Sequence, residues 1–286
     1  MSTIERVRVS YLLDLGPSMF SFRSASLMAL AVLTPVVGVS HRSLSASVTT
    51  RYRYESQTEQ SLDLTAVGGG KQNTVLSRTG WLTVTLTDSA GGKVMRAVID
   101  SISADAESRE AMGAASLDSA RGSVFTGFVA PDGEVSHFTM PLHVGALGAL
   151  LGGSLDEFFP RVKLGWKRGE RWNIATDKPQ IVSNGQLMIK KATTYTARGS
   201  VTRDGGPVDA FDVTFSTTSS GTQQVGQSNA KVEGSSTGTG TWFVAPDGRF
   251  VGGTRSEKND RTLMLTGAPA PVLVTAQVRT TISVIR

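Results

Sequence analysis

Hydrophobic and polar residues alternate with a period of two along most of the chain after Ser47. In SVTTRYRYES, every second residue from Thr50 to Tyr54 falls on one face of an extended strand. GWLTVTLTD repeats the pattern, with the apolar residues from Leu82 to Leu86 on one side and Trp and Thr residues on the other. We therefore predict a mainly β protein, an antiparallel curved sheet or half-barrel.

Turn-forming residues separate the alternating runs and predict hairpins. The chain contains DSAGGK, then RDGG, and two copies of FVAPDG at 128–133 and 243–248. Proline presets φ for a turn, aspartate bonds its own downstream backbone, and glycine accepts positive φ. We interpret both copies as structural turns made by Pro131, Asp132 and Gly133, and by Pro246, Asp247 and Gly248.

The repeated motif also suggests two related β lobes, at 47–140 and 170–286, separated by a helical connector with an aromatic and basic segment at 141–169. PLHVGALGALLGGSLDEFFP is the helical candidate, and 105–116 is either a short helix or a loop. The connector is either an ordinary packed helix or one that plugs a cavity or touches a membrane. Its cavity-facing residues are predicted to be Leu142, Val144, Leu147, Leu150 and Leu151.

The first 46 residues have the pattern of a cleavable secretory signal. Arg23 precedes an apolar stretch from Leu27 to Val39, and small polar residues follow. That stretch is shorter than the roughly 20 residues of a membrane-spanning helix, although an uncleaved anchor is the alternative. We expect a periplasmic or secreted protein, with Met19 as a candidate start.

The amino-acid composition limits which ligands and reactions are expected of this protein. The net charge of +5 is spread along the chain without a basic cluster, so nucleic-acid binding is not expected. Cysteine is absent, which excludes disulfides, a thiolate nucleophile and amino-terminal lipidation. His137 and His143 lack a third ligand at metal-site spacing, and Ser236 in GSSTG precedes a polar strand rather than a helix. We predict no metal, no cofactor and no catalytic residues, and so no enzyme.

Aromatic and basic residues concentrate in one segment, FFPRVKLGWKRGERW. Two interpretations are open: a patch that docks on a hydrophobic or anionic partner, or core aromatics whose basic neighbours extend to solvent. The candidate residues are Phe158, Phe159, Arg161, Trp166, Lys167, Arg168, Arg171 and Trp172.

The same segment resembles one found in uncharacterised exported β-rich proteins of Gram-negative bacteria. The matching residues are Pro160, Val162, Gly169 and Trp172, and the later Tyr195 strand, Gly199 and GTGTWFVAPDG look similar too. The resemblance covers residues 158–286 and implies an envelope protein of antiparallel sheet, without an established activity. Periplasmic open-barrel carriers of lipids and lipoproteins share this general shape, which is an analogy of fold alone.

These features leave three functions to compare. The first is a non-catalytic extrinsic or scaffolding subunit of an envelope complex, with at most peripheral membrane contact. The alternative is a periplasmic carrier of an apolar ligand such as a lipid, and the third is a hydrolase with an unrecognised site. A carrier requires a cavity of several hundred Å³, whereas a scaffold requires a filled interior and an exposed apolar patch.

Overall fold

The structure, a computed structural model, describes residues 46–112, 114–139, 155–163, 165–182, 185–203, 205–225 and 228–285. The predicted signal up to residue 45 lies outside the described residues. So do His143 and the predicted cavity residues from Leu142 to Leu151.

The described strands form one antiparallel sheet of eleven strands in the order β5-β4-β3-β2-β1-β11-β10-β9-β8-β7-β6. Their bounds are β1 Ser47–Asp63, β2 Lys71–Ser89, β3 Gly92–Ala104, β4 Val124–Val129, β5 Val135–Thr139, β6 Arg171–Val182, β7 Gly185–Arg203, β8 Gly206–Val225, β9 Ser228–Val244, β10 Phe250–Leu265 and β11 Val272–Ile285. Pairing of β1 with β11 joins the strands of both predicted lobes into this single sheet.

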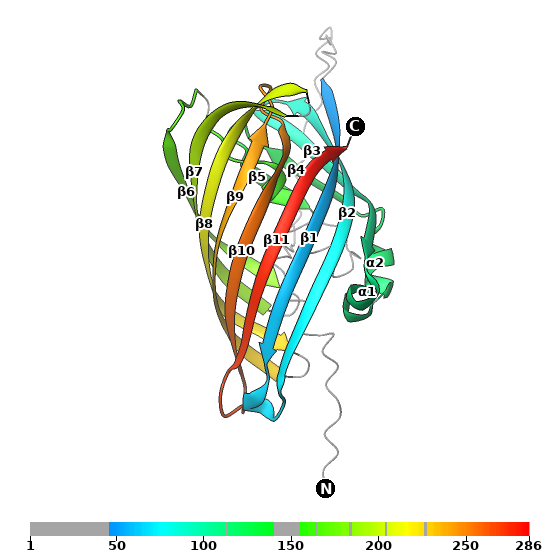
Figure 1. The fold of residues 1–286 in the computed structure, drawn as a ribbon, viewed down its shortest axis with the longest axis vertical. Helices are drawn as coiled ribbons and strands as arrows, with labels where there is room; N and C mark the ends of the chain where they lie inside the picture. The colour runs from blue at the N-terminus through cyan, green and yellow to red at the C-terminus, as the bar shows by residue number, and fades with distance from the viewer. Residues whose placement is uncertain are drawn as a thin grey trace, which may run out of the picture.

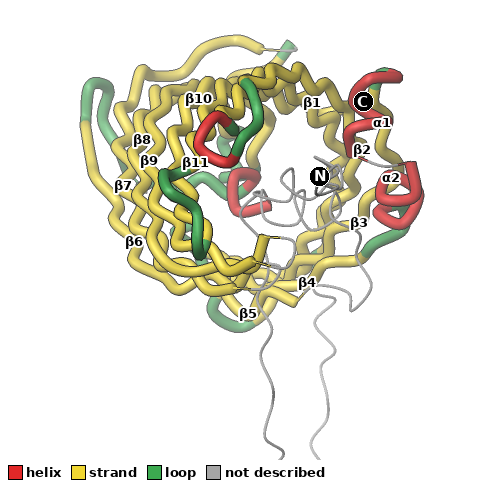
Figure 2. The backbone as a smooth tube through the Cα atoms, turned by 90° about the horizontal axis from the view of Figure 1, so that it is seen from below, coloured by secondary structure: helices red, strands yellow, loops and turns green. Residues whose placement is uncertain are grey.

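The sheet curls strongly around its long axis without closing, as Figures 1 and 2 show. The mainly β, antiparallel, curved fold predicted from the sequence is confirmed. Its two end strands are β5 and β6, and no hydrogen-bond ladder joins them among the described residues. We call the gap between these two strands the seam.

The alternation in the sequence separates a concave face from a convex one. On β1, Tyr52 and Tyr54 are each 3% exposed on the concave face, whereas Arg51 and Arg53 between them are exposed. The convex face is held by polar pairs, such as the hydroxyls of Thr49 and Thr85 at 3.0 Å.

Two short helices connect β3 to β4 and pack beside β2 and β3 (Figure 1): α1 at Ala106–Met112 and α2 at Ala114–Ala120. Asp105 caps α1, because its Oδ1 accepts a hydrogen bond from the Ser108 amide at 2.7 Å. The buried Ser108 Oγ in turn accepts from the Ser77 amide on β2, also at 2.7 Å. Of the two alternatives for 105–116, the helix is the one that forms. None of the described helices is long and apolar enough to cross a membrane.

Apolar residues on the concave face form two clusters. The upper cluster surrounds Tyr52, Leu82 and Phe125, near the start of β1. The lower cluster lies near the end of β1 and contains Leu62, Leu187, Val232, Leu263, Val272 and Val274. Between them the inward-facing residues are mostly polar, so the concave face divides into an apolar, a polar and an apolar layer.

Candidate functional site: a pocket at the seam

The described chain ahead of β6, residues 155–163 and 165–170, packs against the concave face of the curled sheet. It includes a 3-10 turn, η3 at Leu155–Phe158, and we call residues 155–170 the inner segment. Leu155 is fully buried and Phe158 is 2% exposed. The Phe158 ring packs edge-on against Tyr52 and Phe250, with centroids 5.0 and 6.0 Å away. Figure 2 shows a helical turn inside the ring of strands, and this packing fixes η3 on the upper cluster.

The aromatic residues of the predicted patch point inward. Trp166 packs edge-on against Phe211 at 5.4 Å, and Trp172 stacks on Tyr195 at 5.4 Å. Phe159, like these tryptophans, is partly buried against the upper cluster. The basic side chains Lys167, Arg168 and Arg171 are exposed instead. The rings and the cations therefore lie on different sides of the segment, as in core packing with solvated basic neighbours.

Both copies of FVAPDG form the same turn. In each, the alanine amide donates to the carbonyl four residues later, at 2.9 and 2.8 Å, and the glycine amide donates back to the alanine carbonyl at 2.9 Å. The aspartate Oδ1 accepts from the amide two residues on, at 3.1 Å for Asp132 and 3.0 Å for Asp247. Turn geometry thus accounts for one carboxylate oxygen of each aspartate.

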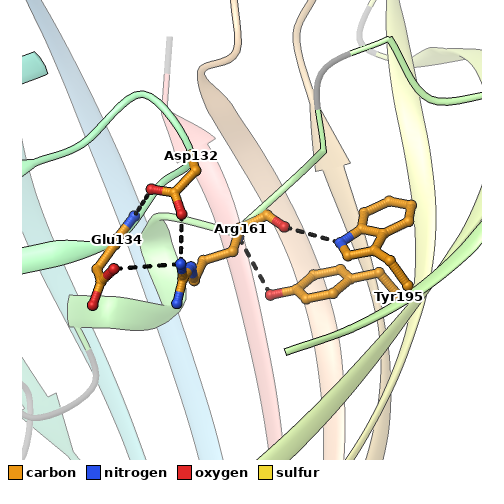
Figure 3. A network of polar contacts seen from close by, with 5 residues as sticks. Asp132, Glu134, Arg161 and Tyr195 are labelled. Atoms are coloured by element: carbon orange, nitrogen blue, oxygen red, sulfur yellow. Dashed lines mark hydrogen bonds and ion pairs between the residues drawn. The ribbon is translucent and has the colours of Figure 1, made fainter. Parts of the chain in front are cut away.

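The first copy makes polar contacts with the inner segment. Asp132 Oδ2 accepts a charged hydrogen bond from Arg161, and Glu134 lies 3.4 Å from the same guanidinium (Figure 3). A Cβ at Gly133 would come within 2.7 Å of the Pro160 carbonyl, whereas one at Gly248 would meet nothing within 4 Å. The two turns are therefore alike in backbone and different in surroundings.

Arg161 connects both ends of the sheet. Its side chain binds the β4–β5 turn, its carbonyl accepts from Trp172 Nε1 on β6 at 3.2 Å, and its amide donates to the Tyr195 hydroxyl on β7 at 3.4 Å (Figure 3). The hydrogen bond from Arg161 lowers the pKa of Asp132, so the pair stays charged into mild acid. We call Arg161, Asp132 and Glu134 the latch, because they hold the inner segment across the seam.

We expect Asp132→Asn to loosen the inner segment and Asp247→Asn to leave it unchanged. Asp132→Asn should raise the rate of amide exchange at 158–163 about two- to fivefold, the size of effect expected for a partly exposed ion pair. A lowered carboxyl pKa stabilises above the unfolded value near 4 and is lost below the folded value. The difference from wild type should therefore persist at pH 5 and disappear well below pH 4, measured by hydrogen exchange with mass spectrometry. Equal effects of the two substitutions would contradict the latch.

A pocket of about 140 Å³ lies behind the latch, between the inner segment and strands β6, β7 and β8. Its walls are mainly apolar: Val135, Phe159, Ile174, Val213 and Trp242. Lys191, Phe215 and Arg255 line its opposite side, which we call the floor. The paired Glu134 and Arg161 line the pocket as well. The pocket thus combines an apolar wall with the cationic side chains of Lys191 and Arg255, a lining suited to an amphipathic small molecule.

The floor depends on small residues in β9. A Cβ at Gly238 would lie 2.1 Å from the Phe215 ring, so the ring rests directly on the glycine backbone. The Arg255 guanidinium lies 4.4 Å from the centroid of that ring, and the Lys191 ammonium 5.8 Å. Arg255 also pairs with Glu257, and their side chains are 17% and 13% exposed. These contacts fix the ring and Arg255 in one arrangement.

A second arginine lies deeper on the same face of β10. Burial lowers the pKa of Arg261, and the Glu257 carboxylate opposes that shift. The guanidinium nevertheless stays charged, because arginine titrates far above neutral pH. Glu257 therefore stands between two cations, Arg255 and Arg261.

The residues that carry hydrolytic or metal chemistry elsewhere are separated here. Ser236 sits in the middle of β9, without the strand–turn–helix of a nucleophile elbow. His137 is exposed on β5 with φ of 48°. Among the described residues, no three His, Asp or Glu side chains are grouped to hold a metal ion.

Comparison with known proteins gives only distant similarity. No protein-family profile and no curated protein matches the sequence. Among solved structures, outer-membrane expressed OmpT of Vibrio cholerae is similar, with 10% identity and a TM-score of 0.23 over 83% of this chain and 98% of that one. The in-vitro folded form of that outer membrane protein shows 7% identity and a TM-score of 0.16, over 82% and 97%. Scores this low do not establish a shared fold.

Proposed function

We propose that this protein is an exported, non-catalytic carrier that binds an amphipathic small molecule on the concave face of its curled sheet. The observation that carries the proposal is the pocket at the seam, where apolar walls meet a floor with Lys191 and Arg255. Ligand pockets combine mostly apolar linings with a few placed polar groups, as this one does.

The size of the pocket limits what enters it in this conformation. At about 140 Å³ it is near the size of a cavity that holds benzene, and below the 300 Å³ or more typical of drug-sized ligands. A longer ligand has to extend along the polar layer, where Thr58 and Gln60 face inward yet remain partly exposed. Displacing the inner segment is the second way to enlarge the site.

The scaffolding function is supported by a different feature, the β6 edge at the seam. Among the described residues no strand pairs with the outer side of β6, and such an edge can pair with a strand of another protein. The aromatic segment gives this alternative less support, because Trp166 and Trp172 pack on the core.

Binding of the neutral fluorescent probe N-phenyl-1-naphthylamine to the purified protein tests the carrier function. Thr193 lines the pocket on β7, and Thr194 beside it faces outward and donates to Asn173 at 2.7 Å. We expect Thr193→Phe to fill the pocket and weaken probe binding about tenfold or more, and Thr194→Phe to leave it unchanged.

Mass spectrometry of the gently purified protein then separates the two functions. A stoichiometric small molecule supports the carrier. Absence of probe binding together with stoichiometric envelope polypeptides would overturn the carrier in favour of the scaffold.

A further inference from the structure

We infer that the seam pocket selects a ligand with an anionic headgroup, a carboxylate or a phosphate on a single apolar chain. This inference rests on the proposed carrier function and specifies its ligand. The residue that carries it is Lys191, which faces the pocket from β7 and is half-buried there.

Lys191 has no carboxylate partner among the described residues, in contrast to its neighbour on the chain. Lys190 faces outward and lies 3.7 Å from Asp177. The Lys191 ammonium lies 5.8 Å from the centroid of the Phe215 ring. An ammonium that has lost part of its hydration is stabilised by an anion, so the pocket favours a ligand that supplies one.

The charged side chains around Lys191 also favour an anionic ligand. On the inward face of the described strands, the polar layer carries Arg78, Lys191, Arg255 and Arg261 against the single carboxylate Glu257. Glu257 is engaged by Arg255 and lies beside Arg261. Glu134 also lines the pocket, and both its carboxylate and that of Asp132 pair with the Arg161 guanidinium. The floor is therefore the cationic end of the site.

The apolar wall determines where the rest of such a ligand lies. Ile174, Val213 and Trp242 line the pocket with the floor residues, so the carbon atoms next to the headgroup contact these side chains. A headgroup at Lys191 and Arg255 also lies over Phe215, whose ring both cations already approach within 6 Å. A cationic headgroup in the same position would be repelled by both side chains.

The test compares four amphiphiles with the same dodecyl chain, titrated into the purified protein below their micelle concentrations. We expect dodecanoate and dodecyl phosphate to bind at least about tenfold more tightly than dodecanol, and dodecyltrimethylammonium to bind most weakly. Lys191→Gln should weaken both anionic ligands about tenfold and leave dodecanol unchanged. Lys190→Gln, the matched control on the outer face, should alter none of them.

The outcomes separate the inference from the function on which it rests. Equal affinity for dodecanol and dodecanoate, or no effect of Lys191→Gln on the anionic ligands, would overturn the anionic headgroup and leave a carrier of neutral ligands. Failure of all four amphiphiles and of N-phenyl-1-naphthylamine to bind would overturn the carrier itself. Where the anionic ligands do bind, their ranking distinguishes a fatty acid from a phosphate ester.

Discussion

Replacing Phe158 with alanine is expected to lower the free energy of unfolding by about 3–4 kcal/mol. The side chain is 2% exposed, and its ring packs edge-on against Tyr52 and Phe250. Truncation removes the transfer free energy of a buried aromatic ring and leaves a cavity under the hydrogen bond from the Tyr52 hydroxyl to the Phe250 carbonyl, which measures 2.8 Å. Because Phe158 anchors the inner segment, exchange at 159–163 should also increase.

Urea denaturation of the Phe158→Ala and Phe243→Ala variants measures how much each substitution lowers the free energy of unfolding. Phe243 lies on the outer side of β9, half-buried, under the guanidinium of Arg203 at 4.3 Å. Its loss should cost only about 1 kcal/mol, mainly the ring's contact with that cation. Similar losses for the two phenylalanines would show that the inner segment is not anchored in the core.

The inward face of the strands could be predicted from the sequence because the signal is local. Residues two apart share a face, so the apolar positions of β1 and of β2 identify the concave side without knowledge of their partners. The turns follow from proline, aspartate and glycine within four residues. Neither inference requires a contact between distant parts of the chain.

The pocket and its latch could not be predicted in the same way. Arg161 and Asp132 are 29 residues apart, and they meet because the described inner segment packs beside the β4–β5 turn. Asp132 and Asp247 lie in the same hexapeptide, FVAPDG, and its turn chemistry explains both aspartates without any distant partner. One signal was present: the alternation in KATTYTA places Lys191 on the same face as the buried Tyr195.

The charged residues of β10 could not be assigned to a face of the sheet from the sequence alone. RSEKNDRT alternates charges on both faces, so its pattern does not identify which of them point inward. Only the pairing of β10 with β9 and β11 places Arg255, Glu257 and Arg261 on the concave side. Small residues on β9 leave room on this face: a Cβ at Gly234 would lie 3.0 Å from Arg261 Cγ, and one at Gly238 2.1 Å from the Phe215 ring that Arg255 contacts.

Glu257→Gln is expected to destabilise the protein by about 2 kcal/mol, because it removes the carboxylate that interacts with both Arg255 and Arg261. The figure is lower than for a fully buried pair, since both side chains of the Arg255–Glu257 pair keep some exposure. Urea denaturation at neutral pH, in low and high salt, measures the change. The loss should persist in high salt because partly buried charges are poorly screened.

The adjacent strand provides a matched control with the same spacing. Lys231 and Glu233 form an ion pair at 2.7 Å on the convex face of β9, with side chains 67% and 61% exposed. Glu233→Gln should leave the urea midpoint nearly unchanged, because solvent screens this pair. If Glu257→Gln also leaves the urea midpoint unchanged, solvent screens the charges on the concave face as it does those on the surface. The floor would then not bind an anion selectively. If Glu257→Gln destabilises the protein as expected, dodecanoate should restore more stability to this variant than to wild type, since the ligand supplies the missing negative charge.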